Sequence, residues 1–387
     1  MKVVMVAGHA ALAPRKVGFH FWSEYLCARG DEVYFITAGQ SWLSMLKTGH
    51  SPEKPHNQWV TLDERFYGMN WVPPFHPCLN KPAFNNVLLP LFSLYPKFFP
   101  ADELARIADA DYIVVESGPG LALIPQLAKV CKNATIIYEV SDRLVTVGAH
   151  PAIIRAEQAA LEYFSLIRVP AMIMVNDFPR SKPVWYCPQG LHKEDFDRRY
   201  ASPYAKSKNV ISVGDMLFDA GAIITMAEAY PEWTFHLFGR NATLNQSLPN
   251  VIEYGEKPIG ELTPYIQHAD IGLAPYRQAP NCEYLSQSSL KMIQYTYCQL
   301  PIVAPSFASA GRPHVLAYSS GDNASQVCDA FARAIAFDRN TINKAKVLSW
   351  AEMFESMLAQ SHNNNQPQNN DQSQNNHQSR TAMRKRA

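Results

Sequence analysis

Short apolar runs alternate with segments of helical periodicity twice along this chain, and this alternation constrains the possible folds more than any other feature. Strands are predicted at Val3–Ala7 and Thr135–Val140 in the first half, and at Val210–Val213 and Ile271–Pro275 in the second. Because strand–helix–strand repeats build parallel sheets, the sequence predicts two Rossmann-like, doubly wound α/β domains. Ligands of such sheets bind beyond the carboxyl ends of the strands, so we expect an active site between the facing domains.

Changes in composition predict the domain boundaries. Residues 1–195 form the expected N-terminal domain and residues 205–340 the C-terminal domain, joined by the polar stretch Gly190–Lys208. Residues 341–360 are predicted to form a closing helix, and residues 361–387 a disordered Asn/Gln-rich tail with no apolar face to bury. The tail ends in a basic cluster, so a weak electrostatic membrane tether is an alternative to simple solvation.

The bulk composition excludes several classes of protein. A net charge of +1 argues against a nucleic-acid binder, which would carry a strongly basic domain. The seven cysteines are scattered without metal-ligand spacing, as expected for reduced thiols in a cytoplasm. The N-terminus lacks the layout of a secretory signal, and no run reaches the roughly 18 apolar residues of a spanning helix. A soluble or peripheral cytoplasmic protein is expected.

The segment Ser286–Pro305 carries the most chemical information. It is predicted to form a hydroxyl-rich loop, a helix at Ser288–Cys298 capped by one of its first serines, and a buried strand. The amino end of that helix offers free N–H groups to an anion, and Lys291 in its first turn suits a diphosphate. Gln294 lies on the same face and can bind ribose hydroxyls. The alternative is a surface lysine on an ordinary amphipathic helix.

This segment resembles the donor-binding motif of GT-B glycosyltransferases. Retaining members of that class carry two glutamates eight positions apart, and the corresponding positions here are Ser286 and Gln294. Both acids are missing, which argues against the common retaining family.

Four short motifs in the same order resemble the GumK family of xanthan-type glucuronosyltransferases: residues 15–21, 140–142, 214–216 and 289–295. The resemblance covers roughly Met1 to Leu358. It implies a GT-B fold and an inverting, metal-independent enzyme of exopolysaccharide synthesis at the cytoplasmic face of the bacterial inner membrane. It also implies transfer of glucuronic acid from UDP-glucuronate to a polyprenyl-diphosphate-linked oligosaccharide, with no cofactor and no divalent metal.

Asp142 is the expected catalytic base. It follows the strand Thr135–Val140, and single-step inversion needs a base that takes the proton of the acceptor hydroxyl. The family resemblance places the base at this aspartate; the alternative is a capping or loop aspartate beside Arg143. Glu139 is the nearest competitor, but strand alternation points it elsewhere. His9 and His20 are weaker candidates.

The resemblance assigns further residues to substrate binding. Met216, Glu256 and Tyr276 follow predicted strands of the C-terminal domain and resemble donor-binding positions, together with Ser289, Lys291 and Gln294. On the acceptor and membrane side, the expected residues are His9, Arg15 and Lys16. The sequence does not decide which cation binds the glucuronate carboxylate. The candidates are Arg15, Lys16, Arg143 and Arg277.

Two other segments have competing interpretations. Asp109 and Asp111 form a D-x-D pattern, but it precedes a strand instead of following one, which favours a helix–strand connection over a metal site. The stretch Trp71–Pro100 is rich in proline and aromatic residues, which suits the headgroup region of a membrane. The alternative is a buried loop that covers the N-terminal sheet.

Three other functions remain possible on the sequence alone. A GT-B transferase with another UDP- or GDP-sugar would keep the class and change the substrate. A nucleotide-sugar 2-epimerase shares the architecture and would need no lipid acceptor. A binding or scaffold protein without catalysis would bind UDP and turn over no donor.

Overall fold

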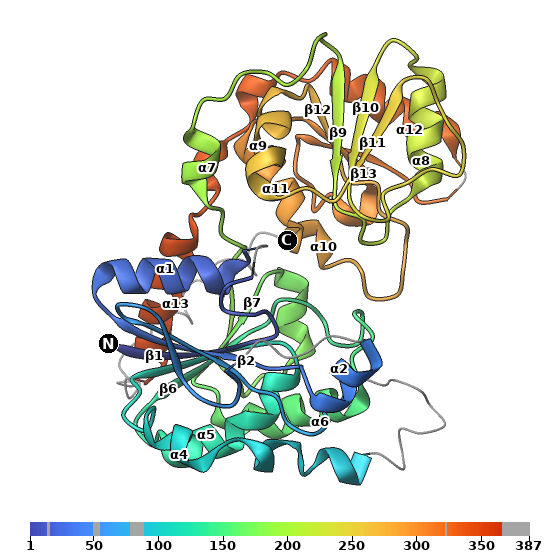
Figure 1. The fold of residues 1–387 in the computed structure, drawn as a ribbon. Coiled ribbons are helices and arrows are strands. Elements are labelled where there is room, and N and C mark those ends of the chain that lie inside the picture. Colours follow the sequence, from blue (N-terminus) through green and yellow to red (C-terminus); the bar gives the residue numbers. More distant parts are fainter. Residues whose placement is uncertain (14–15, 49–54, 78–88, 322, 366–387) are drawn as a thin grey trace, which may run out of the picture.

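Two parallel α/β sheets organise the chain, one in each half (Figure 1). The structure is a computed structural model that describes residues 1–13, 16–48, 55–77, 89–321 and 323–365. The two sheets confirm the predicted α/β class. Within the described part of the chain, no helix combines the length and apolar character that crossing a bilayer requires.

The N-terminal sheet has eight strands in the order β3-β4-β2-β1-β5-β6-β7-β8. All neighbours are parallel except β3 and β4. The strands are β1 (Lys2–Ala7), β2 (Glu32–Thr37), β3 (Val60–Asp63), β4 (Phe66–Asn70), β5 (Tyr112–Glu116), β6 (Thr135–Glu139), β7 (Leu166–Val169) and β8 (Val184–Tyr186).

Helices cover both faces of this sheet. Along β1, Val3 and Met5 pack in one hydrophobic cluster and Val4 and Val6 in another, which explains the uninterrupted apolar run. The α-helices are α1 (Gly18–Arg29), α2 (Trp42–Thr48), α4 (Ala101–Ala105), α5 (Ile124–Val130) and α6 (Pro151–Ala160). The 3₁₀ helices are η1 (Tyr95–Phe98), η2 (Pro119–Leu123), η3 (Leu161–Tyr163) and η4 (Met172–Asp177).

The C-terminal sheet has six parallel strands in the order β11-β10-β9-β12-β13-β14, which is the Rossmann order. The strands are β9 (Asn209–Val213), β10 (Thr234–Phe238), β11 (Val251–Gly255), β12 (Ile271–Leu273), β13 (Ile302–Pro305) and β14 (Val315–Tyr318). The helices are α8 (Ala220–Ala229), α9 (Ile259–His268), α10 (Leu285–Ser288), α11 (Leu290–Tyr297) and α12 (Ala324–Ile335), with η5 (Ser306–Ala308) and η6 (Arg339–Thr341). The strand order reverses between β9 and β12, where a ligand crevice is expected.

The chain crosses between the two domains twice, and the two crossings lie side by side. The outgoing crossing contains α7 (Lys193–Asp197), and the return crossing contains η7 (Lys344–Lys346) before α13 (Trp350–Asn365). The Leu191 N–H donates to Leu348 O at 2.9 Å, and the Trp350 N–H donates to Leu191 O at 3.2 Å. Gly190 is required here, because a Cβ at this position would lie 2.7 Å from Trp350 Cα. These bonds hold the two crossings together as a hinge.

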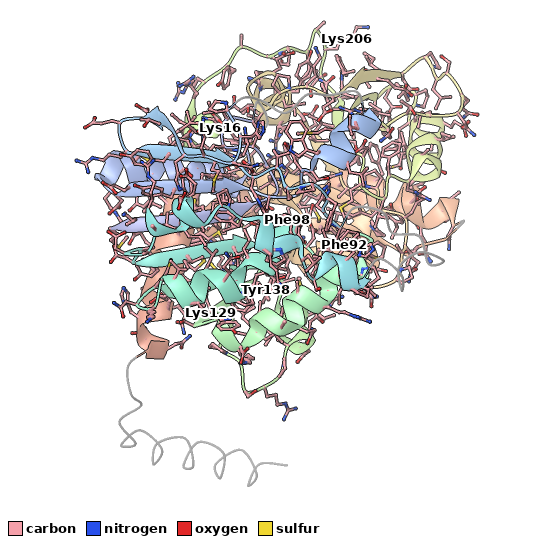
Figure 2. The ribbon with its side chains drawn as sticks, turned by 60° about the horizontal axis from the view of Figure 1, so that its bottom comes forward. Lys16, Phe92, Phe98, Lys129, Tyr138 and Lys206 are labelled. Atoms are coloured by element: carbon pink, nitrogen blue, oxygen red, sulfur yellow. The ribbon has the colours of Figure 1, made fainter. Side chains whose placement is uncertain are left out.

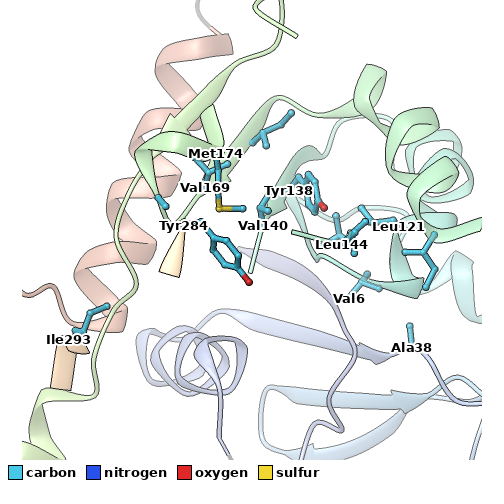
Figure 3. Packing of buried hydrophobic residues seen from close by; sticks show 14 of the residues in the cluster. Val6, Ala38, Leu121, Tyr138, Val140, Leu144, Val169, Met174, Tyr284 and Ile293 are labelled. Carbon is cyan, nitrogen blue, oxygen red and sulfur yellow. The ribbon is translucent and has the colours of Figure 1, made fainter. Parts of the chain in front are cut away.

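Helix α13 belongs to the N-terminal domain by its contacts, although it comes last in the chain. It packs beside α1 (Figure 1), where Trp350, Met353 and Phe354 join the hydrophobic cluster of Phe19 and Trp22. The second large cluster, in contrast, runs from the N-terminal sheet into the C-terminal domain without a break. Figure 3 shows its junction, where Tyr284 of the C-terminal domain lies among side chains of the N-terminal one.

The sequence missed several short strands and misplaced one. The apolar run Ala171–Val175 predicts a buried strand, but β7 lies earlier, and η4 occupies most of that range. Pro170 ends the ladder because it has no N–H to donate, and the side chains of Met172 and Ile173 are exposed. Strands β3, β4 and β14 were not predicted; β3 and β14 are edge strands of four residues.

Candidate active site

The switch point of the C-terminal sheet places the predicted donor residues together. β9 ends at Val213 and β12 at Leu273, and the segments that follow them pair through Phe218 and Tyr276. The turns after β9 and β10 touch at backbone distance: a Cβ on Gly239 would lie 3.1 Å from the carbonyl carbon of Gly214. This close packing brings backbone groups to the switch point, where the ligand crevice is expected, and backbone N–H groups suit a diphosphate.

Lys291 reaches this crevice from the first turn of α11. Its Nζ donates to Gly214 O at 3.4 Å and lies 4.9 Å from the centre of the Tyr276 ring. Burial lowers the pKa of Lys291 to about 8, with an opposing contribution from the charge of Asp215. Among the described residues, no carboxylate forms an ion pair with this half-buried ammonium, so it stands to gain from an anionic ligand.

The amino end of α11 is open in a way that the sequence did not predict. The predicted helix Ser288–Cys298 is broken at Ser289 into α10 and α11, and no serine side chain caps α11. The Ser289 hydroxyl instead shares a hydrogen bond of 2.6 Å with Tyr276, which is buried and has a pKa raised by burial to about 12. In the part of the chain that the structure describes, the N–H groups of Leu290 and Lys291 have no acceptor. Two backbone N–H groups that can donate hydrogen bonds and one lysine side chain thus converge at the amino end of α11.

The other predicted donor residues lie around the amino end of α11 but make fewer contacts with its residues. Gln294 is buried one turn along α11. Glu256 follows β11 and accepts a hydrogen bond of 3.0 Å from Arg240, the first residue after the turn that ends β10. Met216 follows β9, and 40% of its side chain is exposed, as expected for a surface against which a flat base could pack.

Asp142 lies at the carboxyl end of β6 in the N-terminal sheet, held by a network of backbone contacts. Ser117, which follows β5, accepts hydrogen bonds from the N–H groups of Ser141 at 2.8 Å and Asp142 at 3.4 Å. Glu116 accepts from the Ser141 hydroxyl at 3.0 Å and from the Gly8 N–H at 3.2 Å. The network ties the ends of β1, β5 and β6 together, and sequence reasoning singled out neither Ser117 nor Glu116.

One partner of Asp142 comes from the other domain. The Tyr284 hydroxyl donates to Asp142 Oδ1 at 2.7 Å, and the Tyr284 side chain is fully buried. Burial raises the pKa of Asp142, and the Tyr284 hydrogen bond opposes this rise. No sequence signal pointed to Tyr284, because the two residues are far apart in the chain and in different domains.

The cations predicted as candidates for the glucuronate carboxylate differ in the partners that they already have. Arg143 forms a bidentate pair with Asp177, at 2.7 and 3.0 Å, and donates to Asn281 O at 3.2 Å. Lys16 pairs with Glu24 on α1. Arg277 is exposed and donates through Nε to Phe218 O at 3.0 Å, beside the donor crevice. Arg15 lies outside the described residues.

The remaining candidates fall into structural or open positions. His9 is exposed in the loop after β1, whereas His20 is buried, accepting from the Val17 N–H at Nδ1 and contacting Ala10 O at Nε2. Glu139 is buried and paired with Arg168, and burial raises its pKa. The pair faces the cluster of α1 and α13, on the opposite side of the sheet from Val140.

Asp109 and Asp111 lie at the amino ends of β1 and β5, the opposite end of these strands from this site. Asp109 pairs with the Lys2 ammonium, and Asp111 accepts from the Lys2 N–H at 2.7 Å, so both secure the start of β1. The described residues contain no cluster of histidine, cysteine and carboxylate side chains that could hold a metal ion.

Comparison with known proteins relates the chain to glycosyltransferases. Residues 5–170 match the model of the N-terminal domain of the glucuronosyltransferase GumK. A protein of Xanthomonas campestris pv. campestris named UDP-glucuronate:glycolipid 2-beta-glucuronosyltransferase is 27% identical over 360 residues, which cover 92% of this chain and 88% of the relative. A putative teichuronic acid biosynthesis glycosyltransferase of Bacillus subtilis, TuaH, is 32% identical, but only over 24% of this chain and 25% of that protein.

Solved structures support the fold across both domains. Sucrose-phosphate synthase from Thermosynechococcus elongatus aligns with a TM-score of 0.63 at 14% identity, over 94% of this chain and 98% of that one. The trehalose-6-phosphate synthase OtsA aligns with a TM-score of 0.56 at 14% identity, over 94% and 96% of the two chains. Both are similar in fold alone. Together, these matches show the two-domain GT-B fold over both halves of the chain and a similarity of residues 5–170 to the N-terminal domain of the glucuronosyltransferase GumK.

Proposed function

We propose that this protein transfers glucuronic acid from UDP-glucuronate to a lipid-linked oligosaccharide at a membrane surface, with inversion at the sugar. The observation that carries the proposal is Lys291, a half-buried cation beside the open amino end of α11 at the switch point of the C-terminal sheet. The names of the Xanthomonas relative and of the family support glucuronate as the donor sugar and a glycolipid as the acceptor.

The proposed reaction is a single displacement. Asp142 takes the proton of the acceptor hydroxyl, whose oxygen forms a bond to the anomeric carbon of the donor sugar. The bond from that carbon to the β-phosphate oxygen breaks, and its electron pair leaves with UDP. Lys291 and the N–H groups of Leu290 and Lys291 stabilise the charge that develops on the diphosphate.

Binding of the donor is assigned to the surrounding residues. Met216 packs against the uracil ring, Glu256 and Gln294 bind ribose hydroxyls, and Tyr276 with Ser289 borders the diphosphate. Among the described cations, Arg277 is the candidate for the glucuronate carboxylate, because Arg143 and Lys16 already have carboxylate partners. His9 is assigned to the acceptor side of the cleft.

An exposed apolar surface supports contact with the membrane. Phe75 links α2 to residues 89–98: the N–H groups at the start of α2 donate to Pro73 and Pro74, and the Phe75 ring contacts Phe92 and Phe98, labelled in Figure 2. This apolar surface is formed by exposed side chains, namely Trp42, Leu43, Leu46, Leu91, Leu94 and Phe98. Trp71, Tyr95 and Phe99 of the same sequence stretch are buried, so the buried-loop interpretation of Trp71–Pro100 holds for part of it, and membrane contact is proposed for the exposed part. Residues 78–88 lie outside the described residues.

Vesicle binding tests the apolar surface. Leu46 is 78% exposed, so Leu46→Asp is expected to weaken co-sedimentation with phosphatidylglycerol-containing vesicles several-fold without lowering the melting temperature. Ile335→Asp, on α12 of the C-terminal domain, is the matched control and should bind like the wild type. Equal binding by the wild type and Leu46→Asp would contradict membrane contact through this surface.

UDP release with lipid acceptor in detergent tests the function as a whole. We expect release from UDP-glucuronate that depends on the lipid acceptor and is indifferent to a chelator. Release from UDP-glucose alone would keep the transferase class and overturn the donor sugar. Conversion of a UDP-sugar without acceptor would favour an epimerase, and UDP binding without turnover of any donor would favour a binding protein.

A further inference from the structure

The segment between Tyr276 and Ser289 is an arm of the C-terminal domain that reaches into the N-terminal one. Residues 277–288, here called the interdomain arm, start and end at the two donor-site residues that share the 2.6 Å hydrogen bond. In between, Asn281 O accepts hydrogen bonds from Arg143 at 3.2 Å and from Thr146 at 3.3 Å. Gln287 accepts from the Met172 N–H at 2.7 Å.

Tyr284 forms the buried centre of this contact. Its ring joins a hydrophobic cluster with Val140, Val169 and Met174 of the N-terminal domain, as Figure 3 shows, and it has no exposed surface. Its hydroxyl reaches Asp142 Oδ1 at 2.7 Å, and among the described residues no donor reaches Oδ2. One carboxylate oxygen is therefore fixed by the other domain, and the second is left for the acceptor.

We propose that Tyr284 is a positioning residue of the transfer reaction: it fixes the Asp142 carboxylate through Oδ1, so that Oδ2 takes the proton of the acceptor hydroxyl. The inference rests on the proposed function, and it adds a coupling that the proposed function lacks. Because both ends of the arm lie in the donor site, the base is complete only when the donor domain is docked on the acceptor domain.

The charged groups around Asp142 give the sign of the expected pH effect. Arg143 lies beside it and is paired with Asp177 from η4, with Glu283 of the arm 3.9 Å away. Glu116 is bonded to the neighbouring Ser141. Burial raises the pKa of Asp142, and the Tyr284 bond lowers it, so loss of the hydroxyl raises the pKa further. The base then stays protonated to a higher pH.

The pH profile of Tyr284→Phe tests the role, because Phe keeps the ring and loses only the hydroxyl. We expect the acidic limb of kcat/KM to move up by about one pH unit, with unchanged UDP affinity. Tyr297→Phe is the matched control, since Tyr297 donates to Asp197 at 2.7 Å away from the cleft, and its profile should match the wild type. An unmoved limb in Tyr284→Phe would overturn the proposal.

A double variant and an exchange measurement complete the test. In an Asp142→Asn background, Tyr284→Phe should change the residual rate by less than about twofold, because Tyr284 acts through Asp142; a full further loss would overturn the proposal. If the wild type releases UDP from no donor, the proposed function fails by itself. Hydrogen–deuterium exchange of residues 140–148 then measures the contact between the arm and the N-terminal domain independently of activity. Equal exchange in the wild type and in Tyr284→Phe would overturn the docking of the arm.

Discussion

The two halves of the candidate site, proposed to bind the donor and the acceptor, are built in different ways. At the C-terminal sheet, Lys291, Ser289 and Tyr276 come from one domain. The helix end beside them has no side-chain cap, so its N–H groups can bind an anion. At the N-terminal sheet, Asp142 is held by its own domain through Ser117, but its carboxylate is bonded by Tyr284 of the other domain. The proposed donor site is therefore complete within one domain, whereas the proposed base is completed by the contact between the two domains.

The largest expected effect is the loss of transfer activity when Asp142 is replaced, because this change should affect one half of the site and leave UDP binding at the other half intact. Asp142→Asn keeps the shape of the side chain and an oxygen that accepts from Tyr284, but it cannot take a proton. We expect kcat to fall by about 10²- to 10⁴-fold, the usual contribution of a general base. UDP affinity, measured by calorimetry, should stay within about twofold. Full activity of this variant would remove Asp142 from the mechanism, and a matching loss of UDP affinity would break the comparison.

A smaller effect is expected where the two halves are joined. Gly190→Ala places a Cβ against Trp350 Cα, so the crossings must separate, at a cost of about 1–3 kcal/mol in the free energy of unfolding. Transfer should fall while UDP affinity is retained, because only the relative placement of the domains changes. Gly260→Ala on α9 is the control: no atom lies within 4 Å of its added Cβ, so thermal unfolding should be unchanged or slightly raised. Equal melting of both variants would contradict a tight hinge.

The smallest expected effect is the pH dependence of donor binding. Free Lys291 has a pKa lowered to about 8, and a bound diphosphate stabilises its charged form, so binding takes up a proton as the pH rises through this value. UDP affinity should be full below pH 7 and about fourfold weaker at pH 8.5. Lys291→Arg keeps its charge throughout and should show no such fall. A wild-type affinity that is flat to pH 8.5 would show that Lys291 does not contact the diphosphate.

The same contrast explains what the sequence could and could not predict. The predicted donor residues lie in short local motifs after strands, and the structure brings Tyr276, Ser289 and Lys291 of this set together; their role in donor binding stays a prediction. The break at Ser289 was missed because serine at that position is equally compatible with a capped helix. Tyr284 carries no local signal, since its contact with Asp142 spans 142 positions and exists only when the domains meet.

Fold prediction failed for similar reasons at the sheet edges. Edge strands such as β3 and β14 have few residues and little periodicity, and their identity comes from the neighbour they pair with. The apolar run at Ala171–Val175 has the composition of a buried strand. The proline before it, Pro170, lacks the N–H that would continue the hydrogen-bond ladder of β7. Local patterns give the central strands, and tertiary pairing decides the rest.

The double crossing at Gly190 and Trp350 has a consequence for engineering. Because α13 returns to the first sheet, the C-terminal domain is an insertion within the chain of the N-terminal domain. A chimera that exchanges donor specificity with a relative therefore needs two junctions, one in each crossing, and a graft with a single cut would leave α1 without its partner helix. The transplanted domain would also bring its own residue to the position of Tyr284, so donor and acceptor halves are exchangeable only where that residue suits the host's aspartate.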